Sequence, residues 1–276
     1  MNKADRERVI EPTTGLGSLG LKELFEYRDL LRYQVIKEIK GKYRQMALGP
    51  LWIVIQPLMN MVVFSFVFGS VAKMDSAGVP YMLLTYCALV PWTFFQNATS
   101  LSSNCLVTEM GVISKVYFPR LILPISYVIG RLIDFAITFS ILVGMLLFYG
   151  YTPDLKWLFL PFYMMLAVFT TIALSTWTAS LTVRFRDMKF VVQYGLQLSM
   201  FLTPVAFLAS NLPQNWLWIL KLNPMYYVVE GFRWALIDVG QGPEPYMLFS
   251  IFLSVILAVT GVFVFRKTER TIVDLL

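Results

Sequence analysis

The chain has 276 residues, of which 57% are hydrophobic, 16% aromatic and 14% charged, and its formal net charge is +6. About a quarter of the residues of a soluble domain are charged, so this composition excludes an ordinary soluble globular protein. The mean hydropathy of +0.64 indicates an integral membrane protein instead. Two cysteines do not make a disulfide framework, and we expect both to be packing residues.

The first segment with helical periodicity lies between Leu21 and Met46. Apolar residues recur there near helical spacing, while Lys and Arg residues from Arg28 to Arg44 occupy the other faces. Such a helix is typical of segments that lie on an anionic membrane surface. We expect residues 1–50 to form a cytoplasmic segment built on this amphipathic interface helix.

Six apolar stretches are each long enough for a transmembrane helix, which needs about 20 residues. They predict an all-α integral membrane protein whose six transmembrane helices cover residues 51–72, 80–105, 121–149, 157–182, 190–209 and 245–265. A closed β-barrel is excluded, because these runs are too long and lack period-two alternation. The permease domain then covers 51–265, and 266–276 forms a cytoplasmic tail.

The Lys and Arg residues assign a side of the membrane to each connection. Most of them lie before the first expected span, between spans two and three, between spans four and five, or after span six. Because cytoplasmic loops carry the excess of Lys and Arg, both termini are expected in the cytoplasm. The connections at 73–79, 150–156 and 210–244 then face outward.

The charged residues within the expected spans are Arg131 and Asp134, near the cytoplasmic end of the third. Intramembrane charges often mark a proton relay, but a pair one helical turn apart near a span end is less costly to bury, so we favour a structural ion pair. The sequence contains no histidine, no G-x-x-x-x-G-K-[ST] motif and no metal-ligand cluster. We therefore expect a chain that is not an enzyme by itself, holds no cofactor and does not hydrolyse ATP alone.

Several short motifs follow one another in a fixed order along the chain. They are Tyr27-Arg28-Asp29-Leu30-Leu31, Leu48-Gly49-Pro50-Leu51-Trp52, Val90-Pro91-Trp92-Thr93-Phe94-Phe95, Lys115-Val116-Tyr117-Phe118-Pro119-Arg120, Arg184-Phe185-Arg186-Asp187, Leu222-Asn223-Pro224-Met225 and Glu230-Gly231-Phe232-Arg233. With the six-span topology, these motifs make the chain resemble the permease subunits of ATP-binding-cassette exporters for bacterial surface polysaccharides, of the O-antigen and teichoic acid type.

The resemblance implies a homodimer of this permease bound to two copies of a separate cytoplasmic ATPase, which would hold ATP and Mg²⁺. It implies that a lipid-linked glycan, with a lipid of undecaprenyl type, moves from the inner to the outer leaflet of the bacterial inner membrane. Membrane lipids, but no nucleic acid, are the further partners.

Two other functions stay open at this point. A drug or lipid exporter of the same architecture differs in that it would not handle a long glycan. A membrane-embedded glycan-processing enzyme would need paired acidic residues, whereas Asp154, Glu230, Asp238 and Glu244 are scattered along the sequence.

Two short cytoplasmic connections, 106–120 and 183–189, are where a partner ATPase would transmit a rigid-body displacement. The candidate coupling residues are Glu109, Lys115, Arg120, Arg184, Arg186 and Asp187. Each cation alone is equally well explained as an ordinary cytoplasmic charge, but the aromatic and the acid interleaved at 184–187 favour docking.

The phosphate groups of a glycan lipid would attract cations at the cytoplasmic mouth of the path. The candidates are Arg28, Arg32, Lys40 and Arg44, since Arg and Lys bind phosphate through charge-assisted hydrogen bonds. A polybasic tether to anionic lipid explains the same residues, and we prefer it because nothing singles out individual cations.

The outward segment 210–244 is interrupted by Pro213, Asn223-Pro224, Gly231 and Gly240. These breaks suggest an outward re-entrant helical hairpin that caps the outer end of the path. Its aromatic residues, each typical of an interfacial belt, are Trp216, Trp218, Tyr226, Tyr227 and Trp234. Together they would offer flat apolar faces to sugar rings, and they are our candidates for the glycan path and outer gate.

Overall fold

The structure, a computed structural model, describes residues 25–44 and 51–275. Within these ranges every regular element is a helix and no β-strand occurs. The longer helices are α2 (Arg28–Arg44), α3 (Leu51–Phe64), α4 (Tyr81–Ser103), α8 (Leu132–Phe148), α9 (Leu160–Arg184), α10 (Met188–Phe201), α12 (Pro224–Ile237) and α13 (Met247–Leu275). The shorter ones are η1 (Ser65–Val71), α5 (Cys105–Thr108), α6 (Met110–Ile113), α7 (Ile122–Gly130), η2 (Leu155–Phe159), η3 (Ala209–Asn211) and α11 (Gln214–Lys221).

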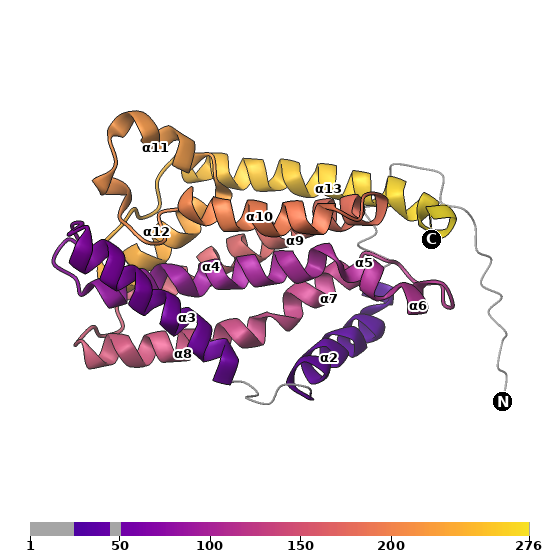
Figure 1. The fold of residues 1–276 in the computed structure, drawn as a ribbon, viewed down its shortest axis with the longest axis horizontal. Helices are drawn as coiled ribbons and strands as arrows, with labels where there is room; N and C mark the ends of the chain where they lie inside the picture. The colour runs from indigo at the N-terminus through magenta and orange to yellow at the C-terminus, as the bar shows by residue number, and fades with distance from the viewer. Residues whose placement is uncertain (1–24, 45–50, 276) are drawn as a thin grey trace.

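The long helices run side by side in an elongated bundle (Figure 1). α5, α6 and the C-terminus lie at one end of this bundle, and α11 lies at the opposite end. The N-terminal amphipathic helix α2 packs against α7, toward the end that carries α5 and α6.

α4 is the central helix of the bundle, since it contacts α3, α7, α8, α9, α10 and α12. Several of its Ser and Thr hydroxyl groups donate hydrogen bonds to nearby carbonyl oxygens. Thr85 donates to Tyr81 at 2.9 Å, and Ser102 crosses to the carbonyl of Pro124 on α7 at 3.0 Å. These bonds let a helix with several hydroxyl groups lie buried on all sides from Leu83 to Phe95. Cys87 on this helix is buried and unpaired, as expected.

Among the described residues, four segments are long and apolar enough to cross a membrane, namely Leu51–Val71, Ile122–Phe148, Leu155–Arg184 and Met247–Glu269. They correspond to the first, third, fourth and sixth expected spans. The other two expected spans correspond to α4, which mixes Thr, Gln, Asn and Ser with its apolar residues, and to α10. α10 has 14 residues, a length of about 21 Å at about 1.5 Å per residue.

The helix predicted over 190–209 ends at Phe201 in the structure, and residues 202–208 form turns and irregular backbone. Pro204 explains this end, because a proline disfavours the α conformation of the residue before it and has no N–H to continue the helix. Irregular backbone leaves carbonyl groups without helical partners, and a buried carbonyl needs another donor.

Arg233 on α12 supplies these donors, although the sequence placed it in a connection that faces outward. Its side chain is 0% exposed. The guanidinium donates to the carbonyl oxygens of Leu84 (3.2 Å), Pro204 (2.5 Å), Val205 (2.7 Å) and Phe207 (2.9 Å) and to the carboxylate of Glu230 (3.2 Å). One side chain therefore joins α12, α4 and the irregular segment after α10.

The two residues between Glu230 and Arg233 explain the rest of this motif. Gly231 faces Tyr163 of α9 so closely that a Cβ atom would overlap the ring atoms Cε1 and Cζ. Phe232 packs edge-on against Phe135 and Phe139 of α8, with ring centroids 6.2 and 6.5 Å away. The motif thus packs α12 against α8 and α9 while it satisfies the buried charges.

Replacing Gly231 with Ala should destabilise the protein by about 1–3 kcal/mol, the usual effect of overpacking a closed core. The matched control is Gly195→Ala on α10, where a Cβ would meet nothing within 4 Å. That control should leave the Tm of the detergent-solubilised protein unchanged or slightly raised, since alanine favours a helix by about 0.5–1 kcal/mol over glycine. Equal Tm values for the two variants would contradict the close packing at Gly231.

Candidate functional site

α2 is held against the bundle by ion pairs. The Nζ atom of Lys37 lies 2.7 and 2.6 Å from the two carboxylate oxygens of Glu109, between α5 and α6. The ammonium of Lys42 pairs with Asp134 at the start of α8. Because the partners come from two different parts of the bundle, these pairs fix both the position and the rotation of α2.

Arg131 and Asp134, our candidates for a structural pair, form an ion pair with Nη1 3.2 Å from Oδ2. The pair is not self-contained, because Asp134 also pairs with Lys42, and Nη2 of Arg131 lies 3.8 Å from Oε2 of Glu38. Arg131 is only 5% exposed, yet its Nε atom has no hydrogen-bond partner among the described residues. A buried N–H without an acceptor is unusual in a native protein and calls for an explanation.

Burial shifts the pKa values of two α2 residues in this network, Glu38 and Lys42, in opposite directions. It raises the pKa of Glu38, while a hydrogen bond with Tyr127 and the charge of Arg131 act against that rise. It lowers the pKa of Lys42, while the hydrogen bond to Asp134 acts against that fall. The partners therefore offset part of the free energy that is needed to keep these charges away from water.

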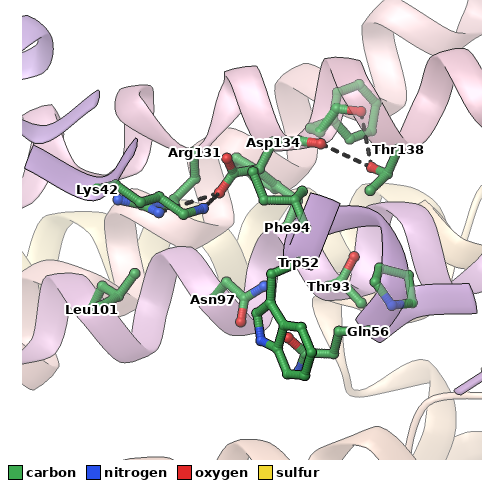
Figure 2. A pocket seen from close by; sticks show the side chains of 13 residues that line it. Lys42, Trp52, Gln56, Thr93, Phe94, Asn97, Leu101, Arg131, Asp134 and Thr138 are labelled. Carbon is green, nitrogen blue, oxygen red and sulfur yellow. Dashed lines mark hydrogen bonds and ion pairs between the residues drawn. The ribbon is translucent and has the colours of Figure 1, made fainter. Parts of the chain in front are cut away.

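Two cavities open beside this network. The smaller one has a volume of about 180 Å³ and lies between α2, α3, α4 and α8. Figure 2 shows Lys42, Arg131 and Asp134 at one wall and the side chains of Trp52 and Asn97 across from them. The larger cavity, of about 570 Å³, lies between α2, α4, α7 and α10. Lys42 and Arg131 line both, so the same two cations separate the cavities.

The structure separates the candidate coupling residues into two groups. Lys115, Arg184, Arg186 and Asp187 are exposed at the end of the bundle that carries α5 and α6. Glu109 is 7% exposed and holds Lys37, so it anchors α2 and does not project from the surface. Arg120 is partly buried, and its Nη1 donates to the carbonyl of Glu269 at 2.7 Å. This bond ties the loop before α7 to α13, which continues as a helix past 265 to Leu275.

The candidate headgroup residues Arg28, Arg32 and Lys40 are exposed on α2 and line neither cavity. The side chain of Arg44 lies outside the described part of the chain. The cations that do line the cavities, Lys42 and Arg131, were not among the headgroup candidates. The sequence feature that could have identified this site is Arg131 itself, a cation inside an apolar span.

The aromatic candidates at the α11 end also separate into two groups. Tyr226 and Tyr227 are 0% and 1% exposed, because they lie on the part of α12 that packs into the core. The hydroxyl of Tyr226 donates to the side-chain carbonyl of Gln241 at 2.9 Å. Trp234 is partly buried against Phe159. The two tryptophans on α11 are the exposed aromatic candidates: Trp216 is 60% exposed and Trp218 is 62% exposed.

Residues 30–237 match the family described as ABC-2 type transporter. The chain belongs to this family. It is similar to two proteins from Klebsiella pneumoniae, each named O-antigen export system permease protein RfbA, with 28% and 26% identity over 249 residues, which are 90% of this chain and 95% of the relative. A Myxococcus xanthus protein of the same name is 28% identical over 254 residues, 90% of this chain and 96% of that protein. The family resemblance in the sequence is therefore confirmed, and this ABC-2 type transporter chain is a multi-pass membrane permease.

Reversing one charge of the pair between Lys37 and Glu109 should loosen α2, whereas reversing both should restore it. In a double-mutant cycle of thermal unfolding, Lys37→Glu and Glu109→Lys should show a coupling free energy of about 0.5–1 kcal/mol. The value is modest because the Lys37 side chain is 41% exposed and therefore screened by solvent.

The control for this cycle is Lys40→Glu, since Lys40 is exposed on the same helix. It should leave the Tm near that of the unmodified protein. A cycle without coupling, or a control as damaging as Lys37→Glu, would show that the pair does not hold α2.

Proposed function

We propose that this ABC-2 type transporter chain moves a lipid-linked bacterial surface polysaccharide of the O-antigen type from the cytoplasmic to the outer side of the inner membrane. The observation that carries the proposal is the similarity, over 90% of the chain, to relatives named O-antigen export system permease protein. The lipid carrier is of undecaprenyl type, and two copies of the chain enclose the path. Trp216 and Trp218 are the aromatic residues that meet sugar rings at its outer end.

A separate ATPase supplies the energy, since the ABC-2 family implies an ATP-binding partner. Two copies of this partner bind the end of the bundle that carries α5 and α6. The exposed Arg184-Phe185-Arg186-Asp187 connection supports this assignment, because it joins α9 directly to α10. A displacement of so short a link moves both helices as rigid bodies.

The chain crosses the membrane six times, with α4 and α10 as the second and fifth spans and both termini in the cytoplasm. The central place of α4 supports this topology, since a helix surrounded by membrane spans shares their environment. If α4 and α10 did not cross, the α9–α10 link would lie on the outer side, away from any cytoplasmic ATPase.

Single cysteines test this topology in a chain whose own Cys87 and Cys105 are replaced by alanine. Leu155 and Tyr117 are suitable positions because they are 78% and 75% exposed and lie in opposite connections. In intact spheroplasts, Leu155→Cys should react with a membrane-impermeant thiol reagent, and Tyr117→Cys should react only after permeabilisation. The reverse pattern would contradict the six-span topology.

Deleting the gene for this chain should abolish long O-antigen on the cell surface, and a plasmid copy should restore it. Within the plasmid copy, Arg184→Glu together with Arg186→Glu should lower the affinity for the ATPase about tenfold or more, because like charges replace complementary ones. Export should fall with it, while the amount of permease in the membrane stays unchanged.

Lys73→Glu is the matched control, since Lys73 is exposed on the connection between η1 and α4 at the opposite end of the bundle. It should leave export and copurification of the ATPase intact. Surface O-antigen in the deletion strain would refute the proposed function, whereas normal export by the double Arg variant would refute only the docking role of this loop.

A further inference from the structure

The larger cavity beside α2 has an excess of positive charge. Its charged lining residues are Lys37, Glu38, Lys42, Arg131 and Lys189, so four cations face one carboxylate. With a volume of about 570 Å³, the cavity lies within the range of about 300–1,000 Å³ that is usual for small-molecule sites. We call it the α2 cavity.

The ion pairs around the α2 cavity neutralise this excess only in part, because Glu38, Glu109 and Asp134 leave four cations against three carboxylates. Glu109 holds Lys37, and Asp134 lies between Lys42 and Arg131. Lys189, at the start of α10, makes no ion pair with a carboxylate in the part of the chain that the structure describes, and its ammonium lies 4.7 Å from the centroid of the Phe190 ring. The cavity is therefore prepared for an anion that the protein itself does not supply.

Arg131 indicates which kind of anion the positive charge would bind. The side chain is 5% exposed and lines the cavity, and its Nε atom has no acceptor among the described residues. Planar guanidinium groups bind the oxygens of a phosphate with paired N–H donors, and a lysine ammonium adds a point charge. A phosphate group at this wall would compete with Asp134 for Lys42 and for the terminal nitrogens of Arg131.

The wall formed by α2 leaves room for such a group. Gly41 lies on this wall, and a Cβ atom added to it would meet no other atom within 4 Å. Between α4 and α5, Asn104 adds an amide group to the lining, whereas the hydroxyl of Tyr127 already donates to Glu38. Neutral donors of this kind complete the hydrogen bonding of phosphate oxygens that two or three cations leave open.

We propose that the α2 cavity binds the phosphate or diphosphate ester at the head of a membrane lipid, with Arg131, Lys42 and Lys189 as its cationic ligands. Asp134 acts as the internal counter-ion that holds Arg131 and Lys42 while the cavity is empty. The identification of this lipid as the glycan carrier rests on the proposed function, whereas the anion site rests only on the geometry. The exposed cations Arg28, Arg32 and Lys40 remain a tether to the membrane surface.

The test uses the full-length permease in nanodiscs of neutral lipid, and the probe is undecaprenyl diphosphate added to the bilayer. The unmodified chain should bind the probe saturably. Lys189→Gln should weaken binding several-fold without a change in Tm, because Lys189 makes no ion pair with the residues that the structure describes. Arg131→Gln should weaken it about tenfold or more, the usual effect of losing a charge-assisted hydrogen bond.

A second variant guards against misfolding, since Arg131→Gln leaves Asp134 beside a single cation. The double variant Arg131→Gln/Asp134→Asn removes both charges together and should still lose binding. Because Lys42 then lacks its carboxylate, binding is measured below the Tm of each variant, so that a folded protein that does not bind is distinguished from an unfolded one. Lys40→Gln is the matched control, because Lys40 is an exposed cation on α2 outside the cavity. If Lys40→Gln weakens binding as much as Lys189→Gln, the surface charge of α2 and not the cavity holds the lipid.

Inorganic diphosphate distinguishes a lipid headgroup from a free anion. It should compete with the lipid, but with an affinity at least about tenfold weaker, because the bilayer holds the lipid head next to α2. Equal affinity would mean that the cavity takes a soluble anion, which would overturn the lipid assignment. Unchanged binding in every Arg131 and Lys189 variant would refute the site even if the chain exports O-antigen. Conversely, binding of the probe together with surface O-antigen that persists in the deletion strain would refute only the proposed function.

Discussion

Buried charge in an apolar bundle must find partners inside the protein, and two arginines show the two outcomes of this constraint. Arg233 binds four carbonyl oxygens and Glu230, so the segment after α10 can leave the helical conformation without leaving those acceptors unsatisfied. Truncating such a side chain typically costs about 3–5 kcal/mol, since Glu230 would remain charged, buried and unpaired. The packing of α12 and the end of α10 both depend on this one guanidinium.

Arg131 meets the same constraint incompletely. Its two terminal nitrogens face Asp134 and Glu38, but the Glu38 oxygen is 3.8 Å away and the Nε atom is left without an acceptor. The difference matters because Arg131 borders cavities on both of its sides, whereas Arg233 is enclosed by protein. A fully satisfied charge stabilises a fold, and an incompletely satisfied charge at a cavity wall is suited to an exchangeable anion.

Composition and charge predicted the membrane setting, the helical class and the ion pair at Arg131, because each follows from local sequence. The contacts that decide the roles of individual side chains join residues that are far apart in the sequence. Glu109 has the position of a docking residue, but it pairs with Lys37, which is 72 residues away. Arg233 has the appearance of a loop charge until the carbonyls 26 to 29 residues before it come close. Tyr226 and Tyr227 are typical of an interface, but α12 packs into the core and buries both.

We propose that this ABC-2 type permease carries a phosphate-linked glycan lipid whose head lies beside α2. Native mass spectrometry of the complex, purified with its ATPase from the host membrane, tests this claim directly. The spectrum should show two copies of the chain with a bound mass that equals a polyprenyl diphosphate glycan, and this mass should disappear in the Arg131→Gln/Asp134→Asn variant. An unmodified complex that retains only ordinary phospholipids would contradict the proposal. The same glycan lipid bound to the unmodified chain and to the variant would contradict it as well.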